Sequence, residues 1–144
     1  MHSRVASLHA RQVTGERVSP ALVDTDILIN FLRGRESARA FLAALSDQET
    51  PHVSVVSVAE LYAGMRPSEE VATRDLIDCM VVLPITSEIA ELAGRLKQET
   101  KGYALELDDC FIAATALIHS LRLATKNTRH YPFEDLDVTS PGNL

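Results

Sequence analysis

From Ala21 onward, the chain alternates short apolar, strand-like runs with longer segments that have helical periodicity. This alternation favours βα units, which assemble into a parallel sheet covered by helices. We therefore expect an α/β fold. The expected strands are 21–24, 52–56, 81–84 and 122–126, with an edge strand at 136–139, and the expected helices are 26–33, 36–47, 58–66, 68–79, 87–101 and 109–120.

The length of 144 residues suits one domain, which we expect to span residues 20–144. Residues 1–19 lack apolar periodicity, so we expect a flexible N-terminal tail there. No apolar run approaches the roughly 18 residues that a membrane span requires, and the N-terminus lacks a signal-peptide core, so we expect a cytoplasmic protein. Cys79 and Cys110 lie in apolar stretches without metal-binding or redox spacing, which predicts two buried free thiols.

The net charge of −6 bears on the possible partners. An acidic chain lacks the broad basic footprint that most nucleic-acid-binding proteins carry. This charge does not exclude a nuclease, because a metal ion bound among the acidic side chains would neutralise part of it. An acidic body also suits a basic protein partner. The sequence contains no phosphate-binding loop and no dinucleotide-binding glycine motif.

Three acidic residues, Asp24, Glu60 and Asp109, each lie where a strand-like run gives way to a helical one. In a parallel α/β sheet, the carboxyl ends of the strands meet at one crevice, where ligands bind. Carboxylates gathered there repel one another unless a cation binds between them, and all-oxygen ligation suits Mg²⁺ or Mn²⁺. We therefore predict a metal site. Asn127 follows another strand-like run and is expected at the same edge, as is His130, which we interpret as structural or exposed.

Each of these acids also has a purely structural interpretation. Ser57 and Glu60 have the spacing of a capping box at a helix start. Asp24, Asp108 or Asp109 could cap a helix or complement its dipole. Because acids recur at all three predicted strand-to-helix junctions, the metal site is the favoured interpretation, but helical periodicity does not decide between Asp108 and Asp109. Asn127 equally suits a turn.

Four blocks of the sequence carry a more specific signal: LVDTDILI at 22–29, VVSVAELYAG at 55–64, DCFIAATA at 109–116 and ATKN at 124–127. In this order and spacing they resemble the PIN-domain ribonucleases, and among them the VapC-type toxins of type II toxin–antitoxin systems. The resemblance covers about residues 20–135. It implies a PIN-like, three-layer α/β/α fold with a central, mostly parallel sheet of four to five strands.

The resemblance also implies a site and a chemistry. It makes Asp24, Glu60 and Asp109 ligands of Mg²⁺ or Mn²⁺, and it favours Asp109 over Asp108. The fourth catalytic position falls on Asn127, where many members have Asp, so a second metal would bind weakly or only with substrate. Such a site would make the chain a metal-dependent endoribonuclease that hydrolyses RNA phosphodiester bonds.

Two kinds of protein partner follow from the resemblance. A cognate antitoxin would control the activity, and a homodimer would form around Leu61, Tyr62, Met65 and the helix at 68–79.

Two other functions remain open on the sequence alone. The neutral residue Asn127 suggests a non-catalytic PIN-like module that binds RNA or protein. The run Asp24-Thr25-Asp26 after an apolar strand matches the nucleophile motif of a haloacid-dehalogenase-like phosphotransferase, although the chain is short for that fold.

Overall fold

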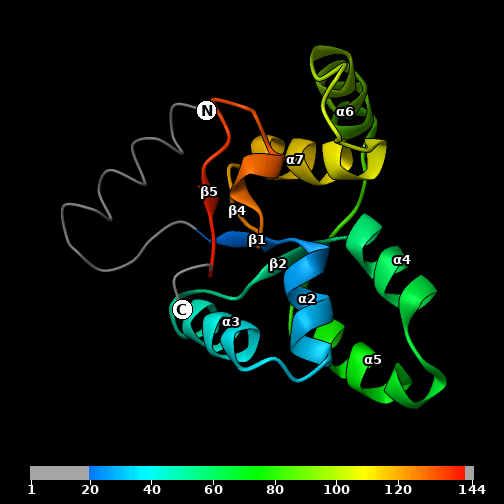
Figure 1. Ribbon diagram of the computed structural model, residues 1–144, viewed down its shortest axis with the longest axis vertical. Helices are drawn as coiled ribbons and strands as arrows, with labels where there is room; N and C mark the ends of the chain where they lie inside the picture. The colour runs from blue at the N-terminus through cyan, green and yellow to red at the C-terminus, as the bar shows by residue number, and fades with distance from the viewer. Residues whose placement is uncertain (1–19, 142–144) are drawn as a thin grey trace.

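The computed structural model describes residues 20–141, and the tail expected at residues 1–19 lies outside them. A five-stranded sheet runs through the middle of the molecule (Figure 1), in the order β3-β2-β1-β4-β5. All four pairings between neighbouring strands are parallel. The predicted fold class is therefore confirmed. The strands are β1 (Ala21–Val23), β2 (His52–Ser54), β3 (Val81–Leu83), β4 (Arg122–Ala124) and β5 (Val138–Thr139).

Helices cover both faces of this sheet and complete the three layers (Figure 1). None of the helices in the described part of the chain has the length and apolarity that a membrane crossing requires. One layer contains α2 (Thr25–Leu32), α3 (Glu36–Gln48) and α5 (Glu70–Asp78), and the other contains α6 (Ser87–Glu99) and α7 (Leu107–His119). Helix α4 (Val55–Gly64) contacts both layers. Two short 3₁₀ turns are η1 (Pro67–Glu69) and η2 (Thr128–His130).

The central strand β1 is buried on both faces. The side chain of Leu22 packs in the core cluster formed with α6 and α7, whereas Ala21 and Val23 pack in the cluster formed with α2, α3 and α5. The alternation arises because successive side chains of a strand point to opposite faces. A strand covered on both sides is apolar at every position, which explains the uninterrupted run Ala21–Val23.

The strand order reverses direction beside β1. From β1 the chain continues to β2 and β3 on one side, while β4 and β5 lie on the other. In parallel sheets, ligands bind outside the carboxyl ends of the strands at such a reversal. Val23 and Ala124, the last residues of β1 and β4, are register partners, so Asp24 and Thr125 leave the sheet side by side.

The boundary between β2 and α4 differs from its prediction. The strand expected at 52–56 is shorter, because α4 begins at Val55. The hydroxyl of Ser54 caps this helix by accepting a hydrogen bond from the backbone N–H two residues further on, at 3.0 Å. The predicted capping box of Ser57 and Glu60 is therefore wrong, since both residues lie inside the helix.

Two expectations about individual side chains are also wrong. Cys79 is exposed because it lies just beyond the end of α5, although Cys110 is buried as expected. Leu61, expected at a dimer interface, is only 3% exposed and packs in the core of its own chain. Tyr62 is exposed and Met65 half-buried, so these two remain available to a partner.

Candidate active site

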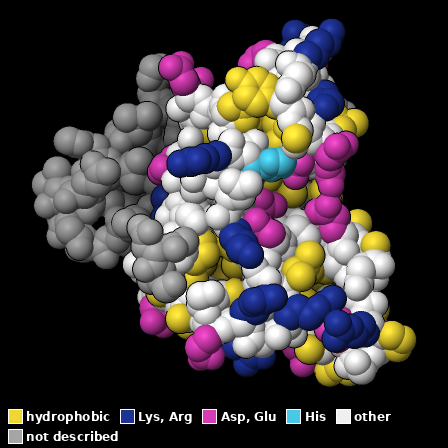
Figure 2. Space-filling model, viewed as in Figure 1, with side chains coloured by type: hydrophobic (Ala, Val, Ile, Leu, Met, Phe, Trp, Pro, Cys, Tyr) yellow, Lys and Arg dark blue, Asp and Glu magenta, His cyan; other side chains and the backbone are white. Residues whose placement is uncertain are grey.

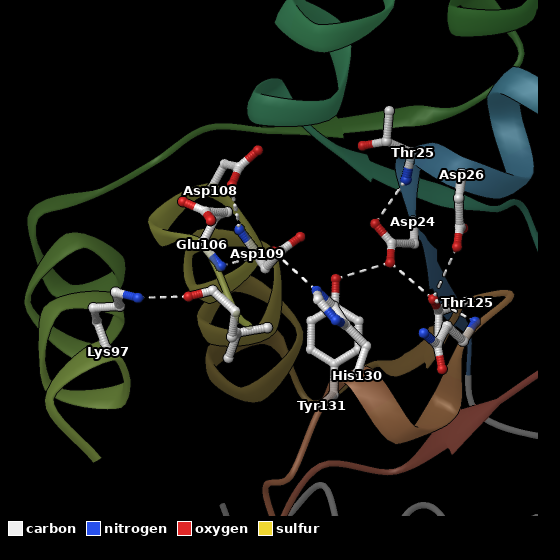
Figure 3. A network of polar contacts seen from close by, with 12 residues as sticks. Asp24, Thr25, Asp26, Lys97, Glu106, Asp108, Asp109, Thr125, His130 and Tyr131 are labelled. Atoms are coloured by element: carbon white, nitrogen blue, oxygen red, sulfur yellow. Dashed lines mark hydrogen bonds and ion pairs between the residues drawn. The ribbon is translucent and has the colours of Figure 1, made fainter. Parts of the chain in front are cut away.

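Asp24 directly follows β1, and its carboxylate accepts three hydrogen bonds (Figure 3). Oδ1 accepts from the backbone N–H of Thr25 at 2.8 Å, which caps α2. Oδ2 accepts from the hydroxyls of Thr125 and Tyr131, each at 2.8 Å. Asp24 is only 7% exposed. Burial, reinforced by the nearby charge of Asp26, raises the pKa of Asp24 to about 6 despite these hydrogen bonds.

Glu60 projects from α4 toward the beginning of α2. The hydroxyl of Thr25 lies 2.6 Å from Glu60 Oε1 and 2.8 Å from the hydroxyl of Ser57. Because a threonine has one hydroxyl proton, Thr25 donates to the carboxylate and accepts from Ser57. Burial raises the pKa of Glu60 to about 7, and the adjacent carboxyl of Asp108 is the next cause. The hydrogen bond from Thr25 therefore does not offset the cost of burying the ionised form of Glu60.

Asp109 lies in the first turn of α7. Its Oδ2 accepts a hydrogen bond from the backbone N–H of Glu106 at 3.0 Å and lies 3.0 Å from Nε2 of His130. An ionised carboxylate can only accept, so the ring nitrogen carries the proton in this contact. The structural interpretation of Asp109 as a capping residue is therefore correct, and the same side chain also lines the site. Asp108 lies beside Glu60 instead.

Asn127 occupies the segment between β4 and η2, where a turn was also a valid interpretation. Its side chain is exposed, and its backbone N–H donates to the hydroxyl of Thr125 at 3.3 Å. The backbone N–H of Lys126 donates to Asp26 at 3.2 Å, which joins this segment to the start of α2. Burial raises the pKa of Asp26 as well.

One open cavity of about 330 Å³ brings these side chains together. The four residues predicted from the sequence all line it, although they come from four different parts of the chain. Figure 2 shows acidic side chains and a histidine near the middle of this face, with lysine and arginine side chains around them. The lining residues are Asp24, Thr25, Asp26, Ile29, Glu60, Asp109, Thr125, Asn127 and His130.

Sequence reasoning missed Tyr131 and assigned His130 no contact with the acids. Both residues follow β4 by a short turn, and both bond to a predicted site carboxylate. Their position after a strand at the reversal point of the sheet was the available signal. The motif blocks end at residue 127 and therefore did not include them.

The chemistry of the donor set fits a divalent cation that prefers oxygen, such as Mg²⁺ or Mn²⁺. Burial and neighbouring carboxyl groups raise the pKa values of Asp24 and Glu60, and a nearby positive charge would favour the ionised forms of both. Within residues 20–141, no group of three or more Asp, Glu, His or Cys side chains is already gathered closely enough to hold an ion.

A family model of the PIN domain matches residues 21–137. The chain belongs to the PIN-domain family. This PIN domain is 41% identical to ribonuclease VapC10 of Mycobacterium tuberculosis over 118 residues, which cover 80% of this chain and 89% of that protein. It is 37% identical to ribonuclease VapC19 of the same organism over 119 residues, which cover 80% of this chain and 95% of the relative. The resemblance inferred from the sequence blocks is therefore confirmed.

Solved structures have the same fold as this PIN domain. A toxin–antitoxin complex from Klebsiella pneumoniae contains a chain with a TM-score of 0.72 and 33% identity, and the match covers 84% of this chain and 97% of that one. FitAcB from Neisseria gonorrhoeae matches with a TM-score of 0.71 and 27% identity, over 86% of this chain and 99% of that one. The match therefore extends along almost the full length of both solved chains.

We expect Asp24 to make the metal-free PIN domain less stable as the pH rises from about 4 to about 7. Its pKa is about 6 in the folded state against an ordinary value of 3.8, so ionisation above pH 4 favours the unfolded chain. The cost is complete above the folded pKa and amounts to about 3 kcal/mol. Asp24→Asn removes this cost.

Urea unfolding in EDTA tests this expectation at about pH 5 and about pH 7.5. The free energy of unfolding of Asp24→Asn should exceed that of the wild type by more at the higher pH. An equal difference at both pH values would contradict the expectation. Comparing the two proteins at each pH removes the contribution of the titrating groups that do not interact with Asp24.

Proposed function

We propose that this PIN domain is a VapC-type toxin, a metal-dependent endoribonuclease that hydrolyses RNA phosphodiester bonds and is controlled by a cognate antitoxin. The observation that carries this proposal is the convergence of Asp24, Glu60 and Asp109 on one cavity at the reversal point of the sheet. The names of the relatives, which are ribonucleases, and of the structural neighbour, a toxin–antitoxin complex, support it.

Asp24, Glu60 and Asp109 would hold Mg²⁺ or Mn²⁺. Such a cation, when bound, supplies an activated water and neutralises charge that develops on the phosphate. Hydrogen bonds within the chain orient the carboxylates. The hydroxyl of Thr25 donates to Glu60, and that of Thr125 donates to Asp24. Asn127 contributes a neutral amide rather than a fourth charge. We therefore propose one firmly held cation and a weaker second site.

The surroundings of the cavity suit an RNA backbone. Lys126 and Arg129 are exposed and adjoin in sequence Asn127 and His130, which line the cavity. Basic side chains that contact phosphates position a nucleic acid without reading its sequence. Because RNA is the proposed substrate, we propose that the protein acts in the cytoplasm.

Protein partners would use two different features of the chain. The acidic centre of the cavity suits a basic segment of an antitoxin, since opposite charges steer association. A homodimer would use the exposed apolar side chains of α4 and α5, among them Tyr62 and Val71.

The family match favours a ribonuclease over the phosphotransferase alternative. In addition, Asp26, the second acid of the phosphotransferase motif, accepts a hydrogen bond from the backbone N–H of Lys126, and the hydroxyl oxygen of Thr125 lies 3.4 Å from it. These contacts give Asp26 a role in joining the start of α2 to the segment after β4.

Removal of divalent metal should stop the reaction. Purified protein, freed of any antitoxin, is expected to cleave total RNA with Mg²⁺ or Mn²⁺ and to lose this activity in EDTA. Excess Mn²⁺ added back should restore it. Cleavage that continues in EDTA would contradict the metal-dependent mechanism. Binding of RNA without cleavage under every metal condition would instead favour the non-catalytic module.

A further inference from the structure

Two neighbouring residues, His130 and Tyr131, each contact a different acid of the site (Figure 3). The hydroxyl of Tyr131 donates to Asp24 Oδ2 at 2.8 Å, and Nε2 of His130 lies 3.0 Å from Asp109 Oδ2. Asp24 leads from β1 into α2, whereas Asp109 belongs to α7 in the opposite helical layer. A single dipeptide therefore links carboxylates that are carried by the two layers.

This dipeptide is held firmly. The two rings pack edge to face, with centroids 5.2 Å apart and an interplanar angle of 89°. Tyr131 is 4% exposed and packs in the core cluster of α6 and α7. The backbone N–H of His130 donates to the carbonyl of Asn127 at 3.1 Å, which closes the 3₁₀ turn. Contacts within the chain thus support both donor groups.

On each acid, two of the hydrogen bonds reach the same carboxylate oxygen. Asp24 Oδ2 accepts from Thr125 and Tyr131, and Asp109 Oδ2 accepts from His130 and the backbone N–H of Glu106. Among residues 20–141, Asp109 Oδ1 accepts no hydrogen bond, and Asp24 Oδ1 accepts one, from a backbone N–H. Because a carboxylate oxygen has two lone pairs, each Oδ1 keeps the capacity to bind a cation.

We propose that His130 and Tyr131 are positioning residues that fix the orientation of the Asp24 and Asp109 carboxylates and leave Oδ1 of each for the metal. This inference rests on the metal site of the proposed function. Groups that hydrogen-bond to metal ligands fix the orientation of those ligands and are typically worth about 10-fold to 100-fold in metal affinity. The asparagine at position 127 adds no charge, so the orientation of the remaining acids matters more in this chain.

Titration of the full chain with Mn²⁺ by calorimetry tests the proposal, because it measures affinity without cleavage. Tyr131→Phe removes only the hydroxyl, and His130→Ala removes only the ring. Each is expected to weaken Mn²⁺ binding about tenfold. His130→Gln should recover part of the loss, since its amide can still donate. Tyr103→Phe serves as the matched control, because Tyr103 is 59% exposed and lies between α6 and α7, and it should bind as the wild type does.

The outcomes separate the two proposals. A wild type that binds no Mn²⁺ would overturn the metal-dependent function itself. A wild type that binds Mn²⁺ while Tyr131→Phe and His130→Ala bind equally tightly would overturn the positioning role alone. Circular dichroism of each metal-free variant establishes that it is folded. A loss in His130→Ala that glutamine fails to recover would also count against positioning through the hydrogen bond.

Discussion

Replacing Asp24 with asparagine is expected to reduce metal-dependent RNA cleavage by about a hundredfold or more, the scale seen when a group that stabilises transition-state charge is lost. The melting temperature should stay the same or rise. Asparagine has the same shape, and its amide oxygen can still accept from the N–H of Thr25, while its NH₂ group can donate to the hydroxyl oxygens of Thr125 and Tyr131. Only the buried negative charge disappears.

The measurement compares cleavage of total RNA by the wild type and the variant in Mg²⁺ and in Mn²⁺, together with thermal unfolding of both proteins. Asp47→Asn is a matched control, because it removes the same charge from an exposed position on α3. That control should cleave as the wild type does. Full activity of Asp24→Asn would remove Asp24 from the proposed site.

Ile112→Ala is expected to cost about 2–5 kcal/mol of stability, which is a large part of the roughly 5–15 kcal/mol that holds a domain of this kind folded. Ile112 is 1% exposed, and it packs in the core cluster of α6 and α7. Its truncation leaves a cavity in the core beside α7, the helix that carries Asp109. Leu107→Ala on the same helix is the control, because Leu107 is 46% exposed and its truncation should cost clearly less stability.

Urea unfolding of Ile112→Ala and Leu107→Ala measures both effects on one scale. Equal losses in the two variants would mean that burial does not determine the stability of α7.

The sequence indicated the parallel sheet because each strand is a short run of apolar residues followed by a helical pattern. The same pattern could not locate the end of β2. Val55 and Val56 have the branched side chains that favour strands. The hydroxyl of Ser54 nevertheless caps a helix that begins at Val55. The strand therefore ends two residues earlier than the local preference of Val55 and Val56 indicates.

Asp24 was predictable because it lies at a strand-to-helix junction that the sequence reveals. Glu60 instead lies inside α4, and Asp109 lies in the first turn of α7, which follows α6 rather than a strand, so the predicted junctions are wrong for these two acids although both line the cavity. The hydrogen-bond partners of the acids were not predictable. Tyr131 and Asp24 are separated by 107 positions, and His130 and Asp109 by 21. No local pattern records such contacts, because they arise only when β4 lies beside β1 and η2 folds back over their ends. Metal binding itself remains a prediction.

The burial of β1 between two separate core clusters has a consequence for the whole domain. Asp24 follows Val23, which packs with α2, α3 and α5, and Asp109 precedes Cys110, which packs with α6 and α7. The distance between the two carboxylates therefore depends on how each helical layer packs against the central sheet. Repacking in either core, far from any acidic side chain, would alter the spacing of the acids while the protein stays folded.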